Sequence, residues 1–156
     1  FDSQLSAREA KTIEHIEIGR DIKEKIEETF YKNGRYVLST KCDDSSMLTN
    51  SLAILAKLKG ENLDSLIKED KSLIEASLSM KAFVYDALLC ANEDNKDFII
   101  EDIKRVYSIM LNEGSTTVWE TLVGADDFFY AGSLCHGWSA IPVYYLNVLC
   151  KGENYD

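Results

Sequence analysis

Residues that could bind and process a small polar molecule gather in one stretch of this sequence, Ser115 to Ala140 (STTVWETLVGADDFFYAGSLCHGWSA). The stretch holds both tryptophans of the chain, Trp119 and Trp138, one of its two histidines, His136, and the acidic residue Glu120. Aromatic rings stack on the apolar face of a sugar ring, while carboxylates and imidazoles hydrogen-bond its hydroxyl groups. These residue types in one segment therefore indicate a carbohydrate site.

Glu120 is the candidate for chemistry within this stretch. Hydrolysis of a glycosidic bond needs one carboxyl group to protonate the leaving oxygen and a second to act as base or nucleophile. Glu120 follows Val118 and Trp119, whose β-branched and aromatic side chains can hold it stiffly. The simpler alternative for Glu120 is a solvated loop carboxylate.

The other residues of the stretch also have structural alternatives. His136 could be a satisfied structural histidine, and the two tryptophans could anchor the core. Asp126 and Asp127 are interpreted as a turn or N-cap pair, with orientation of His136 as the second possibility.

The elements that must position these residues are predicted to be helices. Apolar residues at a helical period predict helices at residues 6–32, 47–56, 77–91 and 99–110, a short one at 63–68 and a last one at 139–149 with Pro142 in its first turn. Asn33-Gly34 is expected to end the first helix, and residues 36–40 to be extended. Asp43 to Ser46 are expected to cap the second helix.

This order predicts an all-α fold of antiparallel helical hairpins in a single domain, residues 1–156. Periodicity does not choose among a bundle, a solenoid and a toroid. The connection of about 25 residues between the last two helices lacks helical periodicity, and connections of that length in compact domains are usually functional or disordered. Its aromatic residues favour an ordered, functional loop.

Composition excludes several classes of function. With 46% apolar and 28% charged residues the chain is typical of a folded domain, and its net charge of −10 argues against a nucleic-acid partner or an anionic membrane surface. No apolar run approaches the roughly 20 residues that span a bilayer. His15 is expected at the surface.

The four cysteines do not form a metal-binding pattern. They are widely spaced, so a structural zinc site is not expected, and their apolar neighbours predict buried, reduced thiols: Cys42, Cys90, Cys135 and Cys150. Reduced thiols favour a cytoplasmic location.

Four motifs of the chain together resemble one enzyme family. The runs STTVWET and AGSLCHGWSAIPVYYL, with DDSSMLTNSLAILAKLKG and SLSMKAFVYDALL upstream, are similar to the end of the catalytic domain of bacterial α-L-rhamnosidases, glycoside hydrolase family 78. The resemblance implies an (α/α)6 toroid of six helical hairpins and an inverting mechanism on a terminal α-L-rhamnosyl group. It implies no cofactor and no metal.

The resemblance also implies roles for single residues. Glu120 matches the general base of the family, His136 a histidine that contacts the sugar, and Trp119 a wall of the pocket, with Trp138 as a further candidate for substrate contact. The Gly-Ala that precedes Thr-Thr in the family is Gly114-Ser115 here.

The family's general acid has no counterpart upstream in this chain. We therefore expect the C-terminal half of a catalytic domain, whose partner is the remaining N-terminal half. Alone, it should be inactive, and its uncovered apolar faces should leave the pocket open or cause self-association. Two alternatives remain: a six-hairpin glycosidase acting on a different sugar, and a non-catalytic helical interaction module.

Overall fold

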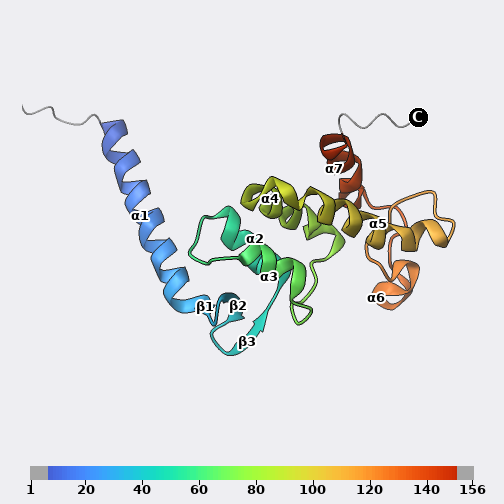
Figure 1. The fold of residues 1–156 in the computed structure, drawn as a ribbon, viewed down its shortest axis with the longest axis horizontal. Helices are drawn as coiled ribbons and strands as arrows, with labels where there is room; N and C mark the ends of the chain where they lie inside the picture. The colour runs from blue at the N-terminus through green and yellow to red at the C-terminus, as the bar shows by residue number, and fades with distance from the viewer. Residues whose placement is uncertain (1–6, 151–156) are drawn as a thin grey trace, which may run out of the picture.

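The computed structural model describes residues 7–150, which form mainly helices strung along one long axis (Figure 1). At one end stands α1 (Ala7–Phe30), and α7 (Ile141–Leu149) lies toward the other end. Between them lie α2 (Met47–Leu55), α3 (Leu63–Glu69), α4 (Lys81–Ala91) and α5 (Lys96–Asn112), whereas the four-residue α6 (Asp127–Tyr130) sits at the periphery. Single 3₁₀ turns occupy Leu78–Met80, Glu93–Asn95, Gly124–Asp126 and Gly137–Ala140. The predicted helices are present, with ends that differ by a few residues.

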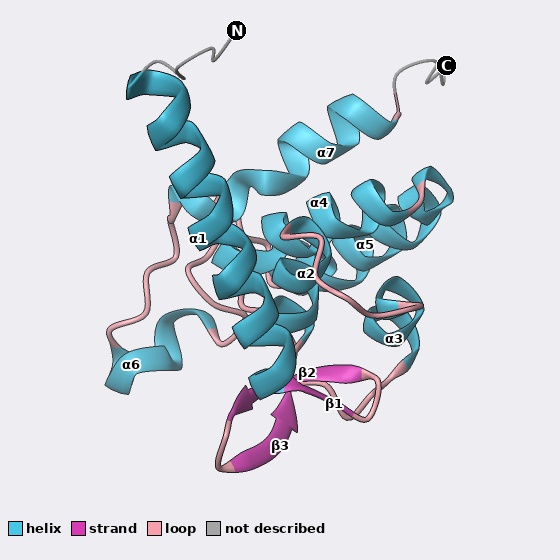
Figure 2. Ribbon diagram, turned by 90° about the vertical axis from the view of Figure 1, so that its left-hand side faces the viewer, coloured by secondary structure: helices cyan, strands magenta, loops and turns pink. Residues whose placement is uncertain are grey.

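A small antiparallel sheet follows α1 (Figure 2), and only its middle strand was predicted, as the extended residues 36–40. Its strands, in spatial order, are β1 (Tyr31–Lys32), β2 (Arg35–Ser39) and β3 (Cys42–Ser45). Asn33 and Gly34, with φ of 51° and 82°, form the two-residue turn between β1 and β2. Both turn positions of such a hairpin need positive φ, which Asn-Gly tolerates well. The first helix therefore ends at Phe30, and Asn33-Gly34 turns a hairpin instead of ending a helix.

The junction between the sheet and α2 corrects a second expectation. Asp43 and Asp44, predicted as capping residues, lie in β3, and Ser46 alone is the N-cap, accepting a hydrogen bond from the Thr49 N–H at 3.0 Å. The buried Asn50 accepts from the Tyr36 N–H at 3.0 Å and donates to Ser45 Oγ at 2.8 Å. These bonds fix the sheet to the first turn of α2.

The main core lies where α4 and α5 meet, and two tyrosines attach the last helix and the loop before it. Its buried residues are Ile67, Ala76, Leu78, Val84, Tyr85, Leu88, Ile99, Ile103, Val106, Tyr107, Met110, Trp119 and Tyr145. Tyr145 of α7 donates to the Ala82 carbonyl oxygen at 2.9 Å and to Asp86 Oδ1 at 2.6 Å. Tyr107 of α5 donates to the Ser139 carbonyl oxygen at 2.8 Å. The C-terminal end of the predicted site loop and the helix that follows it are thereby held against the core.

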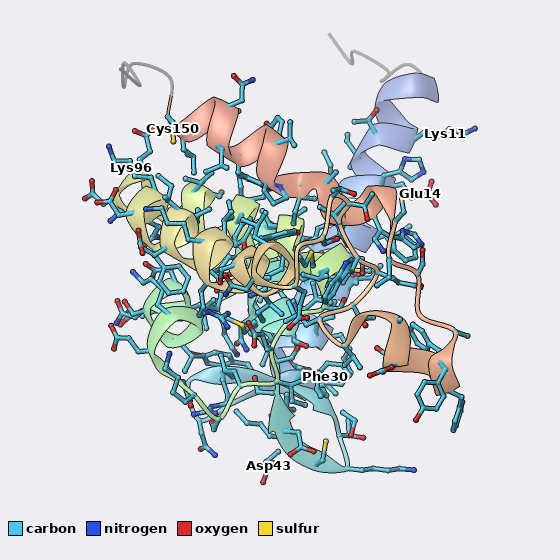
Figure 3. The ribbon with its side chains drawn as sticks, turned by 90° about the vertical axis from the view of Figure 1, so that its right-hand side faces the viewer. Lys11, Glu14, Phe30, Asp43, Lys96 and Cys150 are labelled. Atoms are coloured by element: carbon cyan, nitrogen blue, oxygen red, sulfur yellow. The ribbon has the colours of Figure 1, made fainter. Side chains whose placement is uncertain are left out.

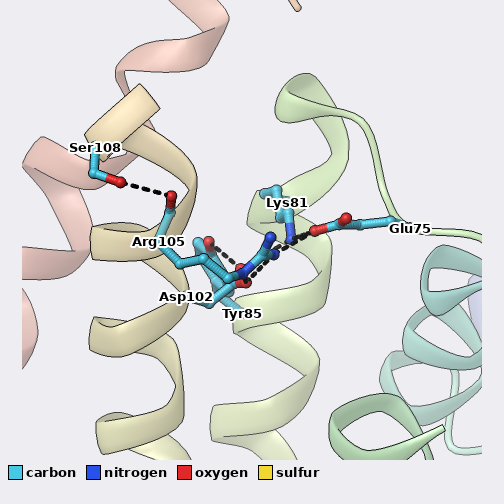
Figure 4. Close-up of polar contacts among 6 residues, drawn as sticks. All are labelled: Glu75, Lys81, Tyr85, Asp102, Arg105 and Ser108. Carbon is cyan, nitrogen blue, oxygen red and sulfur yellow. Dashed lines mark hydrogen bonds and ion pairs between the residues drawn. The ribbon is translucent and has the colours of Figure 1, made fainter. Parts of the chain in front are cut away.

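A network of charged side chains joins α4 to α5 and runs from the buried Lys81 and Asp102 out to the exposed Glu75 and Arg105 (Figure 4). Lys81 is 1% exposed, and its Nζ lies 2.9 Å from Asp102 Oδ2 and 2.9 Å from Glu75 Oε1. Asp102 also accepts from the Tyr85 hydroxyl at 2.8 Å and pairs with Arg105 at 2.6 Å. Burial raises the pKa of Asp102, but Lys81 and these hydrogen bonds outweigh burial and hold that pKa below its usual value. Asp102 therefore stays ionised in the core.

Among residues 11–30 of α1, whose side chains the structure describes, the last turns carry the apolar contacts with the rest of the molecule. Ile26 and Phe30 contact a second apolar cluster of Tyr36, Ala53 and Leu63. The earlier isoleucines are exposed: Ile13, Ile16, Ile18 and Ile22. Figure 3 shows Lys11 and Glu14 on the part of α1 that projects away from the rest of the molecule, and Phe30 at the opposite end of the helix, beside the sheet. His15 is exposed, as expected.

The prediction of four buried thiols is wrong. Cys90 and Cys135 are exposed, while Cys42 and Cys150 are partly buried. An apolar neighbour does not imply burial here, since Leu134, which precedes Cys135, is itself 43% exposed.

Candidate functional site

The segment Ser115 to Ala140 folds back on itself so that its two ends run side by side. The Glu120 N–H donates to the Ser133 carbonyl oxygen at 2.8 Å, and the His136 N–H donates to the Val118 carbonyl oxygen at 2.8 Å. The Thr117 hydroxyl donates to the carbonyl oxygen of Leu134. This pairing brings Glu120 and His136 together although they are 16 positions apart.

Glu120, His136 and Trp138 form one continuous group. Glu120 Oε1 lies 3.9 Å from His136 Nε2, and the ring of His136 stacks on that of Trp138 with centroids 3.9 Å apart and planes 17° from parallel. Trp138 is half exposed, whereas Glu120 and His136 are partly buried. A carboxylate, an imidazole and an exposed aromatic face are therefore presented together, as a sugar site requires.

The two carboxylate oxygens of Glu120 have different surroundings. Oε2 accepts a hydrogen bond from the Ser133 N–H at 3.3 Å, and Oε1 faces His136. The Nδ1 atom on the other side of the His136 ring is buried and has no hydrogen-bond partner among the residues that the structure describes. The backbone therefore orients the Glu120 side chain so that Oε1 lies on the side of His136.

Trp119 lies behind this group, in the core. It is 9% exposed, its indole N–H donates to Ser115 Oγ at 2.9 Å, and a side chain at Gly124 would come within 3.0 Å of its ring. Trp119 thus anchors the backbone that carries Glu120.

Asp127 stabilises the turn that follows, which is the structural role preferred for the Asp126-Asp127 pair. Its Oδ2 accepts from the Thr121 hydroxyl at 2.6 Å and its Oδ1 from the Phe128 N–H at 2.8 Å. Asp126 is exposed. The backbone of Ser133 binds Glu120 twice, through its carbonyl oxygen and through its N–H. Nothing in the sequence marks Ser133 for this role except that it lies among small residues.

Within residues 7–150, no three His, Cys, Asp or Glu side chains are grouped in a way that could hold a metal ion. None of the helices described is both long and apolar enough to cross a bilayer.

Comparison with known proteins gives one informative similarity. No protein-family model matches the sequence, and no curated protein matches it either. The fold is similar to the crystal structure of a GH78 family rhamnosidase of Bacillus sp. GL1, with a TM-score of 0.66 and 25% sequence identity over 81% of this chain. The matched region spans 15% of the length of that rhamnosidase.

This similarity confirms the predicted fold class, antiparallel helical hairpins that form part of an (α/α)6 toroid, with the small sheet as an addition. The chain resembles part of a glycoside hydrolase family 78 rhamnosidase, as its sequence motifs predict.

Proposed function

We propose that this chain is the C-terminal half of the catalytic domain of an inverting glycoside hydrolase that releases terminal α-L-rhamnose. Similarity to a family 78 rhamnosidase supports glycoside hydrolysis. The observation that carries the proposal is the group of Glu120, His136 and Trp138 on one ordered loop, with Glu120 Oε1 3.9 Å from His136 Nε2.

In this proposal Glu120 is the general base. Its Oε2 is held by the Ser133 N–H, so Oε1 takes a proton from the water that attacks the anomeric carbon on the face opposite the leaving group. His136 contacts a sugar hydroxyl through Nε2, and the stacked ring of Trp138 fixes the plane of the imidazole. Trp119 supports this wall of the pocket from behind.

The general acid of the proposed reaction lies outside this chain. An inverting enzyme needs a second carboxyl group about 6.5–9.5 Å from the base. In the loop itself, Asp127 is already engaged by Thr121 and Phe128, and Asp126 is exposed. We expect the purified 156-residue chain to release no aryl group from 4-nitrophenyl α-L-rhamnoside. Hydrolysis above the uncatalysed rate would contradict this part of the proposal.

Substitution of Glu120 in the full-length enzyme tests the proposed base. Glu120→Gln keeps the shape and the Ser133 contact but removes the basic oxygen, so kcat should fall by about 10²–10⁴ while substrate binding is largely kept. The control is Glu113→Gln, an exposed glutamate at the end of α5. Unchanged kcat in Glu120→Gln would remove the assignment.

Two other functions make different predictions in the same experiments. A six-hairpin glycosidase of different specificity would lose activity in Glu120→Gln but would prefer another sugar in a panel of aryl glycosides. A helical interaction module, which the exposed apolar residues of α1 and α7 would also fit, would show no glycosidase activity in any form.

A further inference from the structure

The loop that begins after Glu120 is closed at its base. The Glu120 N–H donates to the Ser133 carbonyl oxygen at 2.8 Å. Next to this pair, Gly132 packs so tightly on Gly124 that a Cβ at position 132 would lie 1.9 Å from the Gly124 carbonyl oxygen. The Thr121 hydroxyl adds a bond to Asp127 at 2.6 Å. The tip of the loop is therefore held in a fixed position relative to Glu120.

The tip has a conformation that its residues do not favour. Phe128, Phe129 and Tyr130 are consecutive and have φ of 50°, 59° and 68°. The left-handed region costs a residue with a side chain about 1–2 kcal/mol. Asp127 stabilises the turn, since its Oδ1 accepts from the Phe128 N–H and its carbonyl oxygen from the Ala131 N–H at 3.0 Å.

The same three side chains are presented to solvent. Phe128 is 54% exposed, Phe129 100% and Tyr130 85%, and Figures 1 and 2 show the α6 turn at the edge of the molecule. A loop with negative φ at these residues would avoid the cost of the left-handed backbone. A loop that buried these rings would gain stability from the apolar surface removed from water. Strain retained at an exposed aromatic surface points to a binding role.

The tip is close enough to Glu120 to take part in the same binding event. Phe129 is four residues from Ser133, so at about 3.3–3.6 Å per residue the two Cα atoms are at most about 14 Å apart. An aryl glycoside or a disaccharide can extend from one to the other. The neighbouring carboxylates Asp126 and Asp127 disfavour an anionic ligand.

We propose that Phe129 and Tyr130 form a stacking platform for the leaving-group side of a neutral glycoside. The ligand chemistry is a flat ring with an apolar face, which either an aromatic aglycone or a second sugar ring supplies. This inference rests on the proposed function of Glu120, because the glycosidic bond must lie between Glu120 and the platform.

The test compares three ligands on the ¹⁵N-labelled 156-residue chain by NMR titration: methyl α-L-rhamnoside, 4-nitrophenyl α-L-rhamnoside and a rhamnosyl disaccharide. All three should shift the amide signals of Glu120 and His136. Only the two ligands with a second ring should also shift those of Phe129 and Tyr130, and stacking should make the preferred one bind about 2- to 12-fold tighter than the methyl glycoside. The tighter binder of these two ligands shows whether the platform prefers an aromatic aglycone or a second sugar ring.

Variants separate stacking from general changes in the chain. Phe129→Ala/Tyr130→Ala should remove the preference for the second ring and leave binding of the methyl glycoside unchanged. Phe129→Leu, which keeps an apolar side chain without a flat face, should weaken the preference. Tyr144→Ala, which removes an exposed aromatic residue on α7, is the control and should have no effect.

Each other outcome overturns the inference. Shifts at Glu120 and His136 alone, with equal affinity for all three ligands, would show a sugar site without a platform. Shifts at the tip alone would place ring binding outside that site. Absence of any shift, together with an unchanged preference for the second ring when Phe129→Ala/Tyr130→Ala is made in the full-length enzyme, would show that the tip serves another purpose, such as contact with a protein. The role of Glu120 is decided separately by turnover of Glu120→Gln in the full-length enzyme.

Discussion

Lys81 is a residue whose charge is tolerated in the core only because of its partners. It is 1% exposed and lies 2.9 Å from both Asp102 and Glu75. Lys81→Met would keep most of the volume but remove one of the two cations that pair with the buried Asp102, leaving Arg105 at 2.6 Å as the other. Because Asp102 loses a charge-assisted hydrogen bond, we expect the free energy of unfolding of the chain to fall by about 1.5–3 kcal/mol, measured by urea denaturation.

The matched control for that measurement is Lys104→Met. Lys104 pairs with Glu101 at 2.7 Å, but both side chains are exposed, so the loss should be about 0–1 kcal/mol. Similar losses in the two variants would show that the ion pairs of Lys81 stabilise the chain no more than the exposed pair of Lys104 does, and that Lys81 is not buried in solution.

At the residue scale, the sequence predicts some of the candidate site and none of the charged network. Glu120, His136 and Trp138 can be found because rare residue types stand close together in one segment, and the structure brings them into contact. Lys81 and Asp102 are 21 positions apart on different helices, and each resembles an ordinary surface residue of an amphipathic helix. Only the packing of α4 on α5 shows that they meet.

At the scale of the element, Gly132 closes the loop that carries the candidate site. Gly132→Ala would place a Cβ 1.9 Å from the Gly124 carbonyl oxygen, so the backbone must separate and disturb the pairing of Glu120 with Ser133. We expect a lower melting temperature for the chain and a large loss of kcat/KM in the full-length enzyme.

Gly137→Ala provides the control for Gly132→Ala. Gly137 is in the same segment, but a Cβ there would meet no atom within 4 Å. Its melting temperature and activity should stay close to those of the parent. Equal effects at the two glycines would mean that the contact between Gly124 and Gly132 does not hold the loop.

Helices could be predicted from the sequence where the spacing of apolar residues alone determines their position. Apolar periodicity placed α2, α4, α5 and α7 within a few residues, and Pro142 lies in the first turn of α7 as expected. Asn33-Gly34 is an ambiguous signal, because the same dipeptide suits a helix end and a hairpin turn. Pairing with β2 decides in favour of the hairpin, and that pairing is a tertiary contact that local patterns do not contain.

At the scale of the whole molecule, apolar surface remains uncovered on α1 and between α5 and α7, in addition to the loop tip of Phe128 to Tyr130. The exposed isoleucines of α1 stand at one end of the long axis (Figure 1). Between α5 and α7 lies an apolar groove of about 580 Å³, lined by residues that include Tyr107, Leu111, Val143 and Leu146. Patches of this kind are typical of surfaces that pack against another part of a protein or another copy.

The exposed face of α1 makes self-association of the isolated chain the expected behaviour. Ile18 and Ile22 lie one turn apart on the same face and are 48% and 55% exposed, and burial of such a side chain is worth about 1.5–3 kcal/mol, or roughly tenfold or more in affinity. In sedimentation equilibrium the apparent mass should therefore rise with concentration. Ile18→Glu/Ile22→Glu should restore a monomer, whereas Leu52→Glu, which charges a single exposed leucine on α2, should not. A parent chain that stays monomeric would show that the α1 face needs a different partner, as expected for a helix that packs against the other half of a toroid.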